Sequence, residues 1–179
     1  LEKVDGVKAT SPFILHEMIA NHDQKTSGVL IKGIEPKTLS KVSDLPEYTE
    51  KEGVVESLTY RRFPPDGEKH RPKILLGHTL ADELGVKAGE TLQITSPLKS
   101  LDPDKWSSGK SSPASKTFEV VGIYRSGFHE YDSRLVMTDY RALQDFFDQG
   151  DVVTGIDMRV DDVFGVGDIK QRITELLEA

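Results

Sequence analysis

Residues 73–97 read KILLGHTLADELGVKAGETLQITSP, and this stretch decides the fold. The short apolar run at 74–76 predicts a buried strand, and apolar residues follow it at helical spacing over 80–84. Gly85 stands where a helix C-terminus favours a residue in the left-handed conformation. Residues 91–95 alternate in polarity, as a half-buried strand does. The stretch therefore predicts a strand, a short helix, a tight turn and a second strand.

A further strand is predicted at residues 118–123, which read FEVVGI. The connection that joins it to the strand at 91–95 covers residues 96–115 and is too polar to belong to the core. Loops of this length inside a compact domain are uncommon, and they are usually functional or disordered. This loop is therefore the first candidate for a functional segment.

The two ends of the chain have mirrored patterns. Thr10 or Ser11 as an N-cap, with Pro12 in the first turn, predicts a helix over residues 11–20, followed by a strand at 28–34. At the other end, alternation over 154–161 predicts a strand, and a helix capped by Asp168 follows it.

We therefore expect an α+β fold in two parts. A split α/β subdomain comprises residues 1–52 plus 151–179. An inserted strand-rich subdomain comprises residues 53–150 and carries a long hairpin loop at 97–113. Within the inserted part, a strand is expected at 135–137 and a helix after it.

Composition excludes several classes of function. The chain of 179 residues has a net charge of −7, so it lacks the basic surplus that nucleic-acid binding requires. It has no cysteine, which excludes disulfides and thiolate-bound metals. No apolar run is long enough to span a bilayer.

The chain begins at Leu1 as if inside a helix or strand, so we expect a fragment of a longer protein.

No recognised catalytic or phosphate-binding motif is present in the sequence. One cluster, His129, Glu130 and Asp132, keeps a small metal-dependent hydrolase open as an alternative, although its spacing matches no strong ligand motif. We expect neither catalysis nor a cofactor or metal.

A second cluster is basic and surrounds the turn sequence Pro-Asp-Gly at 65–67. Its members are Arg61, Arg62, Lys69, His70 and Arg71. Two interpretations stay open for it: a solvated loop, or a contact surface for an anionic partner or a lipid headgroup.

Three segments together resemble a known family. They are ILLGHTLADELGVKAGETLQITSP at 74–97, FEVVGIYRSGFHEYDSRLVM at 118–137 and VVTGIDMRVDD at 152–162. The combination looks like the periplasmic domain of lipoprotein-releasing ABC transporter permeases of the LolC/LolE type. The first segment alone also resembles the wider family of permeases that includes macrolide exporters.

The resemblance implies a domain in the periplasm, held at the bacterial inner membrane, that works by contact and not by chemistry. Its split α/β subdomain would lie near the membrane. It implies four partners: a lipoprotein substrate, a soluble LolA-type lipoprotein carrier, a second permease subunit and a cytoplasmic ATPase that acts through the membrane domain. Nucleic acid is not among them.

The same resemblance implies where the carrier would bind. In the family, a long hairpin loop engages the carrier, and the matching segment here is 97–113. Its candidate contact residues are Pro97, Leu98, Leu101, Trp106 and Pro113. Trp106 is the only tryptophan in the chain and therefore the expected anchor, because buried aromatic residues dominate interface energies.

A small polar pad at the base of the family's hairpin matches Gln93, Ser115 and Lys116 in this sequence. Of these positions, only Lys116 carries a positive charge. Two further alternatives remain open. One is the equivalent domain of an efflux or cell-division permease, which would lack a carrier-binding loop, and the other is a free-standing interaction module.

Overall fold

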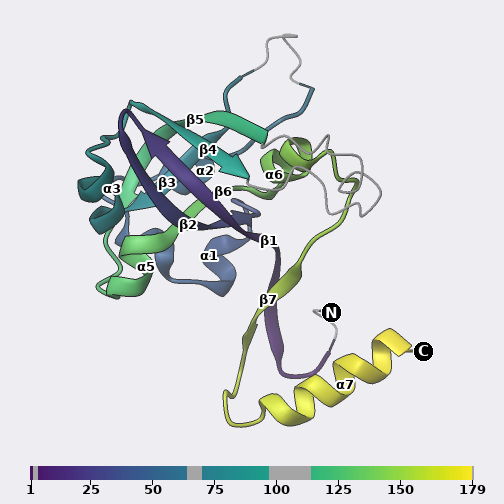
Figure 1. Ribbon diagram of the computed structural model, residues 1–179. Helices are drawn as coiled ribbons and strands as arrows, with labels where there is room; N and C mark the ends of the chain where they lie inside the picture. Colours follow the sequence, from purple (N-terminus) through teal and green to yellow (C-terminus); the bar gives the residue numbers. More distant parts are fainter. Residues whose placement is uncertain (2–3, 64–69, 97–113, 179) are drawn as a thin grey trace.

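The computed structural model describes residues 1, 4–63, 70–96 and 114–178 of the chain (Figure 1). The strands are β1 (Val7–His22), β2 (Lys25–Ile34), β3 (Lys73–Gly77), β4 (Thr91–Ser96), β5 (Ala114–Tyr124), β6 (Leu135–Asp139) and β7 (Gly155–Val160). The helices are α1 (Leu39–Val42), the 3₁₀ helix η1 (Leu45–Tyr48), α2 (Val54–Ser57), α3 (His78–Leu84), α5 (His129–Arg134), α6 (Tyr140–Phe147) and α7 (Val166–Glu178). Helices thus combine with a mixed sheet, which confirms the predicted α+β class.

The strands form one sheet in the order β2-β6-β3-β5-β4-β1-β7, and β1 also pairs with β2. This extra pairing closes six of the strands into a ring, from which β7 extends. All six contribute apolar side chains to one buried cluster, and α3 and α6 add to it from opposite sides of the ring (Figure 1). The interior of the ring is therefore the main hydrophobic core.

Strand β1 contradicts the helix predicted for residues 11–20, so that prediction is wrong. The strand pairs with β2 from Phe13↔Ile34 to His22↔Lys25, and it also pairs with β4 and β7. Its buried apolar residues fit either structure. Ile14 and Met18 are four residues apart, as on one face of a helix, and Met18 and Ala20 are two residues apart, as on one face of a strand. Its partners β4 and β7 lie far along the chain, where a local pattern does not reveal them, whereas β2 follows β1 directly as the second strand of a hairpin.

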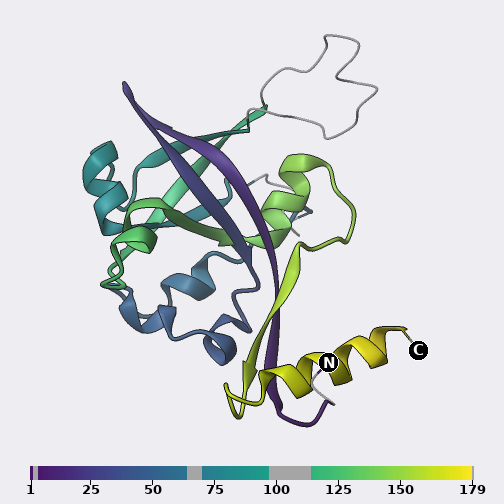
Figure 2. The same cartoon turned by 60° about the horizontal axis from the view of Figure 1, so that its bottom comes forward.

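The first half of β1 leaves the ring together with β7 as a two-stranded arm. The pairs run from Val7↔Val160 to Phe13↔Gly155. Helix α7 follows β7, and its Ile169 is buried beside Gly6. Figures 1 and 2 show α7 and both ends of the chain together at the far end of this arm. Among the described residues, no helix is long and apolar enough to cross a membrane.

The elements predicted from residue 73 onward are confirmed, from β3 to β7. Gly85 has φ of 69°, the left-handed conformation predicted for the end of α3. Helix α7 begins at Val166, two residues before the cap predicted at Asp168. The ring includes strands from both parts of the predicted two-part division, since β2 pairs with β6. The division of the chain into residues 1–52 plus 151–179 and 53–150 stays a prediction.

Candidate functional site

Strands β4 and β5 form the antiparallel hairpin that the sequence predicts. Their pairing runs from Thr91↔Glu119 to Ser96↔Ala114. The segment that joins them, residues 97–113, lies outside the described residues. The candidate contacts within it, Pro97, Leu98, Leu101, Trp106 and Pro113, therefore remain predictions.

Gln93 and Lys116 lie at the base of the hairpin but on opposite faces of it. Gln93 is exposed opposite Thr117, whereas Lys116 lies opposite Ile94, which is fully buried. Side chains alternate between the two faces of a strand, so these neighbouring positions point apart. The structure thus does not bring Gln93 and Lys116 together on one surface.

Close to Ser96 and Ala114, the face that carries Gln93 is polar. The Ser115 hydroxyl shares a hydrogen bond of 2.8 Å with the hydroxyl of Thr95, and Thr95 Oγ1 also accepts one of 3.2 Å from the Asn21 amide. Asn21 pairs with Gln93 across the strands. Gln93 and Ser115 therefore share a surface of hydroxyl and amide groups that can donate and accept hydrogen bonds.

Lys116 points the other way, toward helix α6. Its Nζ atom lies 2.7 Å from Oδ2 of Asp145 and 5.4 Å from the centre of the Tyr60 ring. The Tyr60 hydroxyl donates a hydrogen bond of 2.9 Å to the same carboxylate, and Arg62 Nε lies 3.0 Å from its other oxygen. Asp145 lies on α6, and it therefore connects this helix with the hairpin and with the segment that follows α2.

The charge state of this group follows from its surroundings. Burial raises the pKa of Asp145, but hydrogen bonds from Lys116 and Tyr60 and the charges of Lys116 and Arg62 lower it more, so the net pKa lies below its usual value. Burial and the bond to Asp145 raise the pKa of Tyr60 to about 12. At neutral pH, Asp145 is thus ionised and Tyr60 is a neutral donor.

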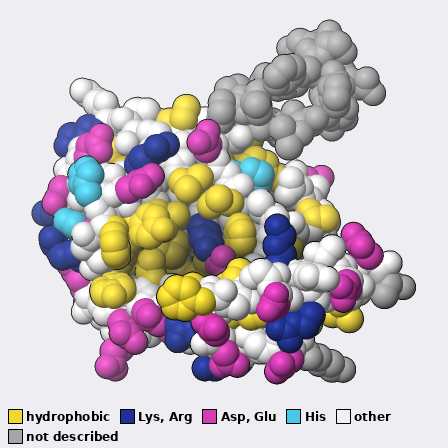
Figure 3. Space-filling view, turned by 90° about the horizontal axis from the view of Figure 1, so that it is seen from below, with side chains coloured by type: hydrophobic (Ala, Val, Ile, Leu, Met, Phe, Trp, Pro, Cys, Tyr) yellow, Lys and Arg dark blue, Asp and Glu magenta, His cyan; other side chains and the backbone are white. Residues whose placement is uncertain are grey.

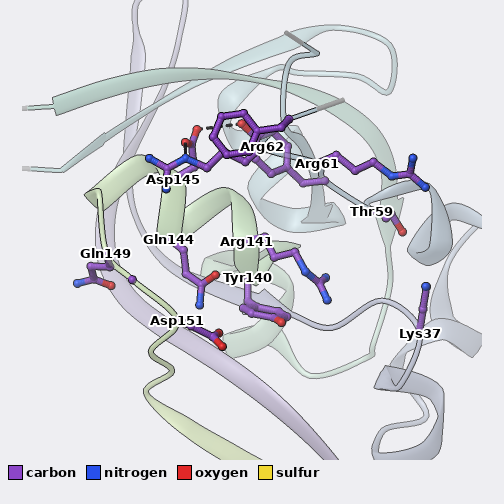
Figure 4. Close-up of a pocket in the computed structure, with 13 residues that line it drawn as sticks. Lys37, Thr59, Arg61, Arg62, Tyr140, Arg141, Gln144, Asp145, Gln149 and Asp151 are labelled. Atoms are coloured by element: carbon purple, nitrogen blue, oxygen red, sulfur yellow. Dashed lines mark hydrogen bonds and ion pairs between the residues drawn. The ribbon is translucent and has the colours of Figure 1, made fainter. Parts of the chain in front are cut away.

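A cavity of about 740 Å³ lies beside this cluster (Figure 4). Three stretches of chain line it: Lys37 after β2, the segment 59–63, and α6 with the residues that follow it. The lining residues are Lys37, Thr59, Tyr60, Arg61, Arg62, Phe63, Tyr140, Arg141, Gln144, Asp145, Gln149, Gly150 and Asp151. The cavity therefore combines cationic, aromatic and amide side chains.

Sequence reasoning found only part of this region. It identified Arg61 and Arg62 as members of a basic cluster, but it did not identify Asp145, Arg141 or Lys37. Asp145 and Arg141 lie on the predicted helix, where polar residues are ordinarily solvated, and no local signal marks them. Lys37 is distant in the sequence from segment 59–63 and from α6, and only the closed ring of strands brings it near them.

The alternative metal site is not assembled. Among the described residues, no group of three or more His, Asp or Glu side chains could hold a metal ion. Asp132 is buried and accepts hydrogen bonds from the backbone and hydroxyl of Ser126, at 2.8 Å each. His129 is exposed at the start of α5. Asp132 therefore has a structural role in the loop that precedes α5.

An apolar hollow of about 330 Å³ opens on another face of the ring, and Figure 3 shows hydrophobic side chains gathered around it. Phe13, Leu15, Leu30, Leu39, Ser43, Leu45, Tyr131, Leu135 and Met137 line it together with Lys32. Lys32 is held by Asp157 at 2.6 Å and lies 4.7 Å from the Phe13 ring centre. The charge inside this hollow is therefore paired.

Curated relatives of modest identity include two transmembrane proteins of lipoprotein-releasing systems. The chain is 26% identical over 163 residues to the lipoprotein-releasing system transmembrane protein LolC of Neisseria meningitidis, covering 90% of this chain and 35% of LolC. It is 24% identical over 165 residues to LolE of Haemophilus influenzae, covering 92% of this chain and 36% of LolE. The chain thus spans about a third of the length of these relatives.

Solved structures share the fold. The extracellular domain of the noncanonic ABC-type transporter YknZ from Gram-positive bacteria matches 94% of this chain and 73% of that one, with a TM-score of 0.56 and 13% identity. The periplasmic region of MacB from Actinobacillus actinomycetemcomitans matches 99% of this chain and 69% of that one, with a TM-score of 0.54 and 14% identity.

The family comparison covers nearly the whole chain. Residues 1–176 match the MacB-like periplasmic core domain. The curated relatives are transmembrane proteins of a lipoprotein-releasing system, which are transporter permeases and not enzymes. The chain therefore belongs to the MacB-like periplasmic core domain family, as the periplasmic domain of an ABC transporter permease.

Proposed function

We propose that this domain serves a permease that releases lipoproteins from the inner membrane and passes them to a soluble LolA-type carrier in the periplasm. The observation that carries the proposal is the β4–β5 hairpin, which pairs up to Ser96↔Ala114 and leaves the long segment 97–113 between its strands. The LolC and LolE relatives, which align over nine-tenths of the chain, support the same assignment.

In this proposal the domain acts by contact. Segment 97–113 binds the carrier through Trp106, Leu98 and Leu101, and the polar face with Gln93 and Ser115 adds hydrogen bonds at its base. A second permease subunit would face this one, and a cytoplasmic ATPase would move both through the membrane domain. The apolar hollow of Figure 3 fits this proposal, because lipoprotein acyl chains need apolar surface outside the bilayer.

A second candidate is the equivalent domain of an efflux permease or a cell-division permease. The fold shared with MacB favours it, and so does the family description that matches the chain. Such a domain would have no need of a carrier-binding segment. Binding of a lipoprotein carrier therefore separates the two candidates.

Replacing Trp106 with alanine is expected to weaken carrier binding by about 30-fold. The reason is that loss of an aromatic anchor at the centre of an interface costs about 2 kcal/mol. Isothermal titration of the purified carrier into the purified domain measures the dissociation constant. The matched control is Phe164→Ala, which removes an aromatic side chain that is fully exposed beside α7.

The control variant is expected to bind the carrier like the unmodified domain. Equal affinity for the Trp106 variant and the unmodified domain would refute the docking role of the segment. Absence of any carrier binding by the unmodified domain would favour the efflux or cell-division candidate.

A further inference from the structure

Strand β7 leaves one edge of the sheet open. In the part of the chain that the structure describes, β7 pairs with β1 alone, and it stands last in the order of the strands. Figures 1 and 2 show it in the arm that extends away from the ring. An open edge presents backbone N–H and C=O groups that can pair with a further strand. The edge of β7 can therefore accept a strand from another molecule.

Exposed apolar side chains are concentrated on β7 and beside it. Among the described residues, twelve large apolar side chains are exposed, and six of them lie between residues 152 and 164. These six are Val152, Val153, Ile156, Met158, Val163 and Phe164. Single exposed apolar residues are ordinary on a protein surface, but a group of them marks a contact site. The open edge thus has apolar surface along it and at both of its ends.

The sequence around Met158 is close to symmetric in its chemistry. It reads VVTGIDMRVDDVF from residue 152 to residue 164. One step outward from Met158, Asp157 corresponds to Arg159, and two steps outward, Ile156 corresponds to Val160. Five and six steps outward, all four residues are apolar. A strand with this sequence is complementary to a second copy of itself that runs in the opposite direction.

The best register for such a pair places Met158 opposite Met158 of the second copy. Side chains alternate between the faces of a strand, so Asp157 and Arg159 share one face and the apolar residues 156, 158 and 160 share the other. Asp157 then lies opposite Arg159 of the second copy, and opposite charges in such a pair are stabilising. A parallel pair in register would place each charge beside its own kind. The charges therefore favour the antiparallel arrangement, which has the two-fold symmetry usual for dimers.

The charged groups of β7 already have partners within the chain, and these contacts extend the complementarity. Lys32 Nζ lies 2.6 Å from Oδ2 of Asp157, and Asp44 binds Nη2 of Arg159. A carboxylate has a second oxygen and a guanidinium has further N–H donors, so both groups can bind again. Across the proposed pair the charges would alternate, from Lys32 and Asp157 to Arg159 and Asp44 of the second copy. No like charges would become neighbours in this row.

We propose that β7 pairs antiparallel with β7 of a second copy of this chain, centred on Met158, so that the two sheets become continuous. Residues 152–153 of each copy then approach residues 163–164 of the other at the two ends of the ladder. The contact is separate from segment 97–113, and it does not depend on the carrier-binding role proposed above.

The dimer formed in this way is expected to be weak. A single pair of short edge strands buries less than the standard interface of about 1,600 Å², so the dissociation constant should lie above about 10 μM. Chemical trapping therefore detects it better than separation by size. The chain has no cysteine, so an introduced thiol can form a disulfide only with its copy in another molecule.

The test is oxidation of the variant Met158→Cys with copper phenanthroline, followed by electrophoresis without reductant. Directly opposite residues of antiparallel strands have Cα atoms about 4.5–5.5 Å apart, within the range that a disulfide spans. The matched control is Ile156→Cys, since Ile156 is 41% exposed and Met158 is 37% exposed. In the proposed register, position 156 and its copy lie four residues apart along the strands, about 13 Å, which is too far for a disulfide.

The double variant Ile156→Cys/Val160→Cys tests the same register with Met158 in place, because it puts a thiol opposite a thiol again. Covalent dimer is expected to form at least tenfold faster in Met158→Cys and in the double variant than in Ile156→Cys. Equal rates in the two single variants would overturn the register and with it the proposal. Absence of covalent dimer in both Met158→Cys and the double variant would overturn the contact itself.

Discussion

Replacing Asp132 with alanine is expected to lower the free energy of unfolding by about 3 kcal/mol. The carboxylate is 1% exposed and accepts hydrogen bonds from the backbone N–H of Ser126 and of Gly127, at 2.8 and 3.2 Å, and from the Ser126 hydroxyl. His78 Nδ1 lies 3.2 Å from it. The substitution would remove the shared acceptor of these partly buried donors, and urea unfolding followed by circular dichroism measures the loss.

The control for this prediction is Asp161→Ala, which breaks an ion pair with Lys8 in which both side chains are more than half exposed. Exposed pairs contribute between 0 and about 1 kcal/mol, so this variant should unfold almost as the unmodified domain does. A loss below about 1 kcal/mol for the Asp132 variant would contradict the structural role assigned to this carboxylate.

The same carboxylate predicts a dependence of stability on pH. Burial raises the pKa of Asp132, but hydrogen bonds from Ser126 and Gly127 and the charge of His78 lower it more, so its pKa in the folded state lies below the usual value. Its stabilising contribution is therefore complete above the unfolded pKa of about 4 and disappears as pH falls through the folded pKa. Asp132→Asn should consequently lose less stability on acidification than the unmodified domain.

Gly77→Ala is the second substitution with a large expected effect, a loss of about 3 kcal/mol in the free energy of unfolding. A Cβ atom at Gly77 would lie 2.3 Å from the carbonyl oxygen of Asp132 and 2.6 Å from its carbonyl carbon. Both atoms belong to the backbone, so either β3 or α5 must move. Gly77 has φ of −68°, which means that it is required for space and not for backbone conformation.

The control here is Gly28→Ala in strand β2, where an added Cβ atom would meet nothing within 4 Å. That variant should keep the stability of the unmodified domain within about 0.5 kcal/mol. Thermal unfolding of both variants measures the difference. Similar melting temperatures for the two would show that β3 and α5 are not closely packed.

The sequence predicts the fold well where structure is set by neighbouring residues. Segment 73–97 gives β3, α3 and β4 because burial, helical spacing and a left-handed Gly85 all occur within a few residues. The prediction from sequence fails at β1, because its apolar residues at positions 14 and 18 also fit a helix. Strand β1 forms a local hairpin with β2, but its pairing with β4 and β7 depends on contacts across most of the chain.

For the candidate sites too, the sequence predicts local features and misses those that depend on distant residues. The β4–β5 hairpin is local, so the sequence locates its base correctly. The opposite orientation of Gln93 and Lys116 follows from the register of the strands, which the sequence alone does not fix. The cavity beside α6 is assembled from three separated stretches, and a polar residue on a helix such as Asp145 carries no local sign of its partners Lys116 and Tyr60.

The most direct test of the account measures handover in the complete transporter. The permease, with its partner subunits and ATPase, is reconstituted in liposomes with a fluorescent lipoprotein, and ATP-driven transfer to the soluble carrier is followed for the unmodified protein and for a variant in which residues 100–112 are replaced by a Gly-Ser linker of equal length. Transfer is expected to fall at least tenfold while ATP hydrolysis is retained, because the carrier can no longer dock on segment 97–113. Transfer at the unmodified rate by the variant would contradict it.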